Sequence, residues 1–302
     1  MRNKKLLVFN FICVFGFILI ELGLPTLLAR MIDVGIRNGD REYIWKMGMA
    51  MIAITLTGIA MNIMLGYFTS RITTNIVADV RDDLFEKVQG YSHTEYEKIG
   101  VSSLITRVTN DAYQIMLFLQ NILRIGLMTP MMFAVSLYMV MRTSTKLGMY
   151  VLGALPILLI AVIAIAKISE PLSNKQQANL DKINGILREN LSGLRVIRAF
   201  VNEKFEEKRF SKVNQAYASS SRSLFRLMAT AQPGFFFLFN IVMVLIIWSG
   251  SIQIENGQLQ VGDLIAFIEY IFHALFSFML FATIFTTVSY THLRAHETDS
   301  YL

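Results

Sequence analysis

Cysteine is almost absent from this sequence: Cys13 is the single one, so no disulfide bond can form within the chain. Charged residues are also scarce, at 17% of the chain, whereas 54% of the residues are hydrophobic. This balance excludes an ordinary soluble domain. No Gly-x4-Gly-Lys-Ser/Thr loop occurs, so the sequence shows no means of binding ATP itself. The net charge of +6 does not indicate nucleic-acid binding, because the basic residues cluster beside apolar runs.

Long apolar runs are what the sequence has in place of charge. A helix needs about 20 apolar residues to cross a bilayer. Six runs come near or exceed that length: Leu6–Leu28, Met47–Phe68, Met116–Met141, Leu147–Ile168, Pro233–Ser249 and Leu264–Val288. The first, third and fifth connections are short, whereas the second and fourth, Thr69–Ile115 and Ser169–Gln232, are long and polar. The two long connections must therefore lie on the same side of the membrane.

Basic residues predict which side that is. Ser169–Gln232 has eleven Lys and Arg residues against six Asp and Glu, whereas Gly250–Asp263 has no Lys or Arg. Because basic loops stay in the cytoplasm, we expect the amino terminus and both long connections there. A cleaved signal peptide over Met1–Leu28 is the weaker alternative, since its apolar run is too long and no small-x-small site follows.

Each long connection is predicted to form a helical hairpin. From Tyr43 to Val88 no proline interrupts, and beyond Phe68 apolar residues recur at helical spacing. One helix over this range would be about 69 Å long, roughly twice the apolar thickness of a bilayer. The chain then turns near Gly90 and returns in a helix from about Ser102.

The second hairpin is predicted to repeat this plan. Pro171 bends or interrupts the chain, a break falls near Gly193, and a return helix runs from about Phe205 to Ala229. The expected fold class is therefore an all-α membrane protein with six transmembrane helices and two long cytoplasmic helical hairpins.

The tips of the hairpins carry a family resemblance. The first reads Tyr96-Glu-Lys-Ile-Gly-Val-Ser-Ser-Leu-Ile-Thr-Arg-Val-Thr-Asn-Asp111, and the second reads Arg188-Glu-Asn-Leu-Ser-Gly-Leu-Arg-Val-Ile-Arg-Ala-Phe-Val-Asn-Glu203. In this order they resemble the intracellular loops of type I ABC exporters, the ATP-binding-cassette half-transporters that expel drugs, lipids or peptides. The resemblance implies an ABC transporter type 1 transmembrane domain over residues 1–289. One departure is Ser102, where many members have glycine.

The resemblance implies that each tip is a short coupling helix docked on a nucleotide-binding domain. The first coupling helix would comprise His93, Thr94, Glu95, Tyr96, Glu97, Lys98 and Ile99. The second would comprise Ser192, Gly193, Leu194, Arg195, Val196, Ile197, Arg198, Ala199 and Phe200. ATP and magnesium are expected on that nucleotide-binding domain, which this sequence does not contain. The other expected partners are the lipid bilayer and a second half-transporter, in a homodimer or heterodimer. The alternative is that the apolar tip residues only cap their own hairpins.

Three charged residues near the tips are candidates for transmission: Arg107, Asp111 and Glu189. Arg107 and Asp111 are four residues apart, and an ordinary intrahelical ion pair is the first interpretation. Polar residues inside the apolar runs are candidates for a substrate cavity, because such groups usually face a cavity or a partner. They are Glu21, Asn62, Gln120, Asn240, Glu269, Tyr270 and His273. The last three are expected to share one side of the sixth run, with a helix-to-helix hydrogen bond as the alternative role.

The carboxyl end, Tyr290–Leu302, resembles translated sequencing-adapter read-through and is expected to be a non-native tail. Its two histidines are therefore discounted, and no metal site is expected. The predicted function is the membrane-spanning part of an ATP-driven exporter, without catalytic residues of its own, in a bacterial cytoplasmic membrane. An ion-coupled secondary transporter or a membrane signalling scaffold is the alternative.

Overall fold

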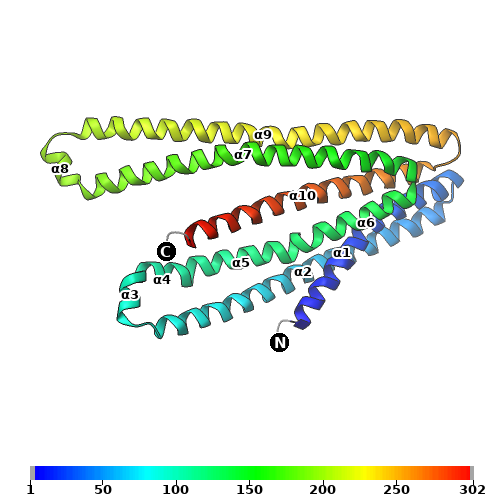
Figure 1. Ribbon diagram of the computed structural model, residues 1–302. Helices are drawn as coiled ribbons and strands as arrows, with labels where there is room; N and C mark the ends of the chain where they lie inside the picture. The colour runs from blue at the N-terminus through cyan, green and yellow to red at the C-terminus, as the bar shows by residue number, and fades with distance from the viewer. Residues whose placement is uncertain (1–3, 300–302) are drawn as a thin grey trace. The chain divides into compact units, whose positions relative to one another are not determined.

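The computed structural model describes residues 4–299, with side chains described up to residue 281 (Figure 1). Over this range every element is helical, which confirms the predicted fold class. Six helical stretches within it are long and apolar enough to cross a membrane. The elements are α1 (Lys4–Arg30), η1 (Met31–Ile36), α2 (Arg41–Gln89), α3 (His93–Ile99), α4 (Val101–Thr106), η2 (Arg107–Asp111), α5 (Ala112–Asn121), η3 (Ile122–Gly126), α6 (Leu127–Thr143), α7 (Thr145–Ser192), α8 (Leu194–Ala199), α9 (Glu203–Glu255) and α10 (Val261–Asp299).

The chain divides into two compact units. The first comprises Met1–Val151 together with Leu245–Leu302, and the second comprises Leu152–Val244. The first unit therefore contains α1 to α6 and α10 with the outer ends of α7 and α9. The second contains the rest of α7 and α9 together with α8.

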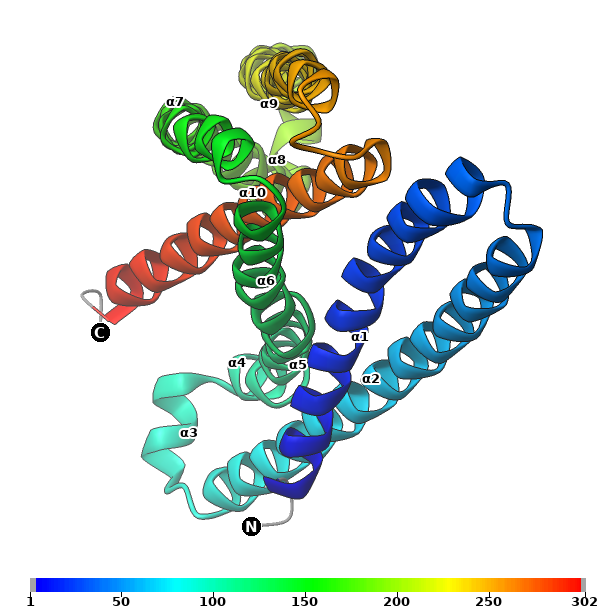
Figure 2. The ribbon, with the colours of Figure 1, turned by 90° about the vertical axis from the view of Figure 1, so that its right-hand side faces the viewer.

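In the first unit, α1 and α2 form an antiparallel hairpin (Figure 2). Asp40 starts α2 by accepting a hydrogen bond from the backbone N–H of Tyr43, 3.0 Å away. The two helices approach closely at Gly58, where a Cβ would lie 2.9 Å from Cγ2 of Ile20. Nearer the amino terminus, the buried Asn10 side chain donates to the hydroxyl of Thr69 at 2.7 Å. The 49 residues of α2 extend over about 74 Å, so this helix is far longer than a bilayer is thick.

Helix α10 packs against α1 and α6 and forms the core of the first unit. Its buried face has an apolar residue every three or four positions, including Phe267, Ile271 and Leu275. The amino-terminal end of α10 meets η1, which follows α1: the backbone N–H of Gly262 donates to Oδ1 of Asp33 at 2.7 Å. A Cβ on Gly262 would lie 2.8 Å from Cα of Ala29, so only glycine allows this approach.

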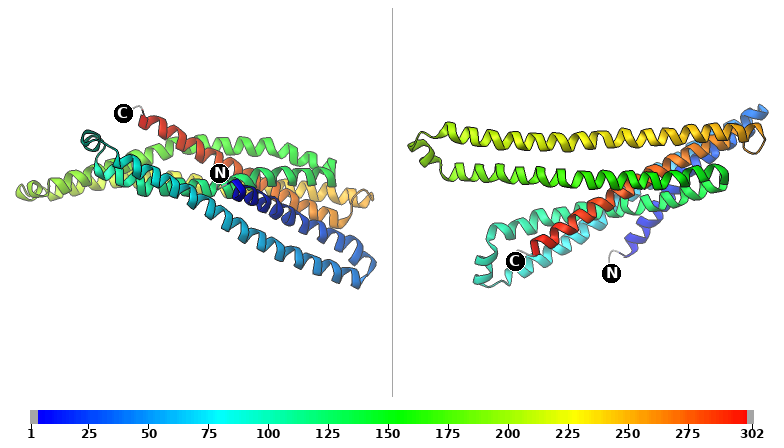
Figure 3. Two further views of the ribbon diagram at one scale, coloured as in Figure 1. Left: turned by 90° about the horizontal axis from the view of Figure 1, so that it is seen from below. Right: turned by 45° about the horizontal axis from the view of Figure 1, so that its top comes forward.

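The second unit is an antiparallel pair of very long helices, drawn in green and yellow in Figure 3. The amide of Asn179 donates to the hydroxyl of Ser220 at 3.2 Å, and the amide of Gln176 donates to the hydroxyl of Ser221 at 2.9 Å. Both contacts have the same register as the ion pair between Glu189 and Arg209. Side-chain contacts thus join the two helices between Gln176 and Glu189 of α7, and of these three α7 residues the sequence analysis singled out only Glu189.

Of the two outcomes predicted for Pro171, a bend or an interruption, the structure excludes the interruption. Pro171 does not interrupt the chain, because α7 is continuous from Thr145 to Ser192 with Pro156 and Pro171 inside it. A proline removes one backbone hydrogen bond, and forty-eight residues of helix with apolar packing tolerate that loss. The predicted break near Gly193 is present, since α7 ends at Ser192.

Helix α10 continues past the predicted boundary at Tyr290 as far as Asp299. Residues 300–302 of the expected non-native tail lie outside the described residues. The division of the chain at residue 290 remains a prediction.

Candidate coupling tips and membrane groove

The first tip is a single short helix, α3, over the same residues as the predicted first coupling helix, His93–Ile99. A capping box starts it: both the backbone N–H and the hydroxyl of Ser92 donate to the Glu95 carboxylate, at 2.7 and 2.8 Å. These two hydrogen bonds lower the pKa of Glu95. Gly100 ends the helix with a φ of +82°, which a residue with a side chain rarely adopts.

The aromatic residue of α3 turns back to its own hairpin. The hydroxyl of Tyr96 donates to the carbonyl oxygen of Val88 at 2.7 Å, and its ring packs edge to face against Tyr91. The residues that α3 exposes are polar: His93 and Glu97 lie 3.5 Å apart on its outer face, next to Lys98. For Tyr96, the structure therefore supports the alternative of capping the hairpin.

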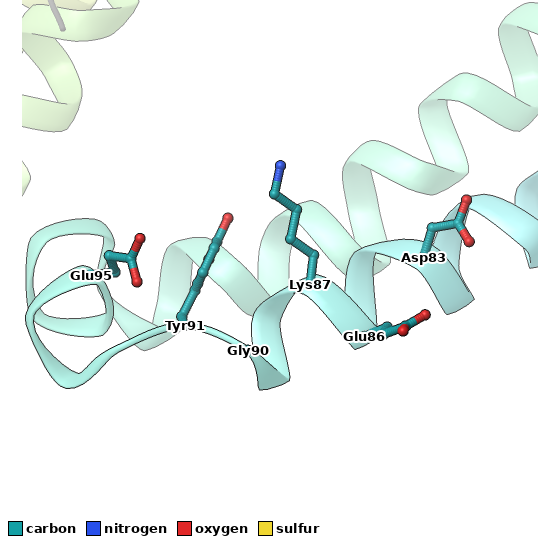
Figure 4. Close-up of a pocket in the computed structure, with 6 residues that line it drawn as sticks. All are labelled: Asp83, Glu86, Lys87, Gly90, Tyr91 and Glu95. Atoms are coloured by element: carbon teal, nitrogen blue, oxygen red, sulfur yellow. The ribbon is translucent and has the colours of Figure 1, made fainter.

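A pocket of about 610 Å³ opens where α2 turns into α3 (Figure 4). Its lining is mainly acidic and comprises Asp83, Glu86, Lys87, Gly90, Tyr91 and Glu95. In Figure 4 the side chains of Lys87 and Tyr91 point to the same side of the turn. The first tip thus offers a polar, predominantly acidic surface.

The second tip is organised around α8, which is shorter than the predicted range Ser192–Phe200. Ser192 is the last residue of α7, Gly193 precedes the first residue of α8, and Phe200 follows its last. The reason is local: Gly193 breaks the helix, and Val201 has a φ of +52°, so helical winding stops there. A left-handed conformation at a β-branched residue is strained, and such strain is typical of functional positions.

The surface of the second tip is apolar where that of the first is polar. Phe200 is 78% exposed and Val201 is 81% exposed, and Leu194 and Val196 are exposed beside them. Ile197 is half-buried. Arg195 and Arg198 add positive charge to the same short helix. Within this chain nothing covers the described side chains of this apolar group, and large exposed apolar groups mark interaction surfaces.

The charged candidates for transmission have different surroundings. Glu189 lies 2.7 Å from Arg209 and so joins the two helices of the second hairpin just below the tip. Among the described residues no ion pair joins Arg107 to Asp111, so the expected intrahelical pair is wrong. Both residues lie in η2, a π-helical stretch that the prediction did not anticipate.

Two of the predicted cavity residues, Glu21 and Asn62, come together in a groove of about 320 Å³ between α1 and α2. We call this the α1–α2 groove; its lining is Phe17, Ile20, Glu21, Leu24, Thr55, Gly58, Ile59, Asn62 and Ile63. The Oδ1 atom of Asn62 accepts a hydrogen bond of 3.4 Å from Arg124, which lies outside the lining. Sequence analysis did not single out Thr55, because a threonine in an apolar run carries no distinct signal.

The other predicted cavity residues do not gather with these two. Tyr270 is buried, and its hydroxyl lies 2.6 Å from that of Thr26, so it joins α10 to α1. Glu269 is exposed and therefore does not share the side of Tyr270, which corrects that expectation. Gln120 and His273 are half-buried, and the exposed Asn240 bonds to its own helix at Phe236. The helix-to-helix hydrogen bond is thus the role that the structure supports for Tyr270.

Comparison with known proteins agrees with this architecture. The family model of the ABC transporter transmembrane region matches residues 7–280 of this chain. The chain is 33% identical over 270 residues to the ABC transporter ATP-binding protein YfiB of Bacillus subtilis, covering 88% of this chain and 47% of YfiB. It is 32% identical over 262 residues to Rv1273c of Mycobacterium tuberculosis, an ABC transporter ATP-binding protein, covering 87% of this chain and 45% of that protein. An export ATP-binding/permease protein of Rickettsia bellii is 27% identical over 216 residues, which cover 70% of this chain and 37% of that one.

The chain therefore spans less than half the length of these relatives. The resemblance noted at the hairpin tips is confirmed, and it favours a transporter of this class over an ion-coupled secondary transporter or a signalling scaffold. The chain belongs to the ABC transporter transmembrane region family and is a multi-pass membrane domain.

Proposed function

We propose that this domain forms the substrate pathway of an ATP-driven exporter and is coupled to separate nucleotide-binding domains through α3 and α8. Two relatives are named as ATP-binding proteins and a third as an export ATP-binding/permease protein, and each is more than twice as long as the aligned region. ATP and magnesium would bind to a nucleotide-binding domain outside this sequence. Whether the transporter is a homodimer or a heterodimer is left open by the proposal.

The hairpin geometry supports mechanical coupling. Helices α7 and α9 have 48 and 53 residues, or about 72 and 80 Å, and side-chain contacts join them along the second unit. A stiff helical pair moves as one body, so a displacement at its tip is transmitted to its membrane-spanning end. The ion pair of Glu189 with Arg209 fixes the register of the two helices nearest to α8.

The observation that carries the proposal is the apolar surface of the second tip. Phe200 and Val201 are almost fully exposed at the end of a long polar hairpin. Exposing a phenylalanine to water forgoes about 1.5–3 kcal/mol of burial. A groove on a nucleotide-binding domain would recover this free energy. The first tip, with its acidic pocket and polar α3 face, would contact a surface of different chemistry.

Phe200→Ala tests this role in a full-length transporter that contains its nucleotide-binding domain. We expect the variant to keep its melting temperature and ATP hydrolysis, while substrate stimulation and export fall sharply. The expected cause is the removal of an apolar anchor that contributes about 1–3 kcal/mol to binding at the interface. Phe225→Ala, which removes a similarly exposed phenylalanine from the stem of α9, is the matched control and should transport normally.

The capping alternative makes the opposite prediction. If Phe200 only caps its own hairpin, Phe200→Ala lowers the melting temperature and the surviving protein stays coupled. That result would count against docking by α8.

The orientation in the membrane is part of the proposal. The basic connection that contains α8 supports a cytoplasmic position for both tips in a bacterial cell, with the amino terminus on the same side. In a Cys13→Ser background, a cysteine at Asn38 should react with an impermeant thiol reagent in intact cells. A cysteine introduced by Gly193→Cys should react only after lysis. Its labelling in intact cells would show that the orientation is the opposite of the one proposed.

A further inference from the structure

The α1–α2 groove has a chemical bias that points to a class of ligand. We propose that it binds an amphipathic organic cation, with the Glu21 carboxylate as the counter-ion. The inference rests on the proposed transport function, because a groove within the spanning helices of an exporter is placed to contact its substrate.

The lining of the groove has one acidic residue and no basic residue. Glu21 is the one charged residue in its lining, and among the described residues no Lys, Arg or His lies within ion-pair distance of it. The nearest basic side chain with a known contact to the groove is Arg124, which bonds to Asn62 from outside the lining. A carboxylate without a basic partner in an apolar setting is costly to ionise, and a cation that approaches it lowers that cost.

The uncharged polar groups add further acceptors. The hydroxyl of Thr55 donates its proton to the carbonyl of Met51 at 2.8 Å, which leaves only its lone pairs for a ligand. The amide nitrogen of Asn62 is the single donor that these residues offer. Acceptors therefore outnumber donors.

The remaining walls are apolar and can take up a hydrocarbon body. Phe17, Ile20 and Leu24 come from α1, and Ile59 and Ile63 come from α2. Gly58 has no side chain to fill the space between the helices. A volume of about 320 Å³ is within the range of small-molecule sites. An ion with a charged centre and apolar substituents matches both parts of the groove.

Tetraphenylphosphonium and tetraphenylborate test the inference, because they have nearly the same size and shape but opposite charge. The purified chain is placed in phosphatidylcholine nanodiscs, and ion-selective electrodes measure the free concentration of each ion. Empty nanodiscs correct for partition into lipid. We expect saturable binding of the phosphonium alone, weakened about tenfold by Glu21→Gln, or about 1.4 kcal/mol. Glu269→Gln removes an exposed carboxylate of α10 outside the groove and should leave binding unchanged.

A second pair of variants keeps the test decisive if Glu21→Gln does not fold. Ile59→Trp fills the groove and should abolish saturable binding, whereas Ile52→Trp, exposed on α2 outside the lining, should not. Equal binding of both ions, no saturable binding, or binding insensitive to Glu21→Gln and Ile59→Trp would overturn the inference. The Phe200 experiment is independent of these ions, so such a result with intact coupling would leave the proposed function standing.

Discussion

Replacing Gly262 with alanine should strongly destabilise the first unit. The new Cβ would lie 2.8 Å from Cα of Ala29 and 2.5 Å from Oδ2 of Asp33, and closer still to the carbonyl oxygen of Ala29. Two of these three atoms belong to backbone and cannot rotate away, so α10 must move from the end of α1. Such overpacking costs about 1–3 kcal/mol. The move also stretches the 2.7 Å hydrogen bond from the Gly262 N–H to Asp33, and hydrogen bonds to charged groups are worth about 1.5–3 kcal/mol.

Part of that hydrogen bond survives a small shift, so we expect the free energy of unfolding to fall by about 2–4 kcal/mol in total. The melting temperature of the detergent-purified chain, followed by tryptophan fluorescence, should fall by about 5–10 °C, since about 1 kcal/mol corresponds to 2–4 °C at this size.

Two other glycines provide the controls. In Gly250→Ala, the new Cβ would lie 2.6 Å from Cδ1 of Leu264, the end of a flexible side chain, so the cost should be smaller. Gly66 in α2 has no described atom within 4 Å of its Cβ position, and Gly66→Ala should be neutral or stabilising by up to about 1 kcal/mol. Equal melting temperatures for the Gly262 and Gly66 variants would refute the reasoning from close packing.

Three further predictions concern the tips. The lowered pKa of Glu95 means that its cap stabilises α3 above the ordinary carboxyl pKa, and that this contribution is lost as the pH falls through the lowered value. Limited proteolysis at the first tip should therefore increase in acid, and in Glu95→Gln it should vary less with pH. Val201→Gly should increase the free energy of unfolding by up to about 1 kcal/mol and so raise the melting temperature slightly, because glycine adopts a φ of +52° without strain. A lower melting temperature would argue against strain at this residue. Arg209→Met should leave the melting temperature nearly unchanged, since both partners of the pair with Glu189 are substantially exposed, and a clear fall would mean that the pair is better shielded than its exposure indicates.

Much of the architecture was predictable from the sequence because the bilayer imposes simple requirements on it. Apolar length predicted the spanning helices, and the absence of proline between Tyr43 and Val88 predicted a helix far longer than the membrane. The family resemblance gave the bounds of α3, and the structure shows their local cause: a capping box at Ser92 and a glycine with positive φ at Gly100. Where a local rule had to compete with its surroundings, it failed: Pro171 did not interrupt α7, and Arg107 and Asp111 did not pair within a π-helical stretch.

The sequence by itself determined the helical class, the order of the spans and the location of the tips, because hydrophobic length and turn residues act over short stretches of chain. Only the tertiary structure decided which polar residues meet. Glu21 and Asn62 line one groove while Tyr270 bonds to Thr26, and no spacing within a single helix distinguishes these outcomes. They depend on the rotation and register of one helix against another, which are set by contacts such as Gly58 against Ile20 between residues distant in the chain.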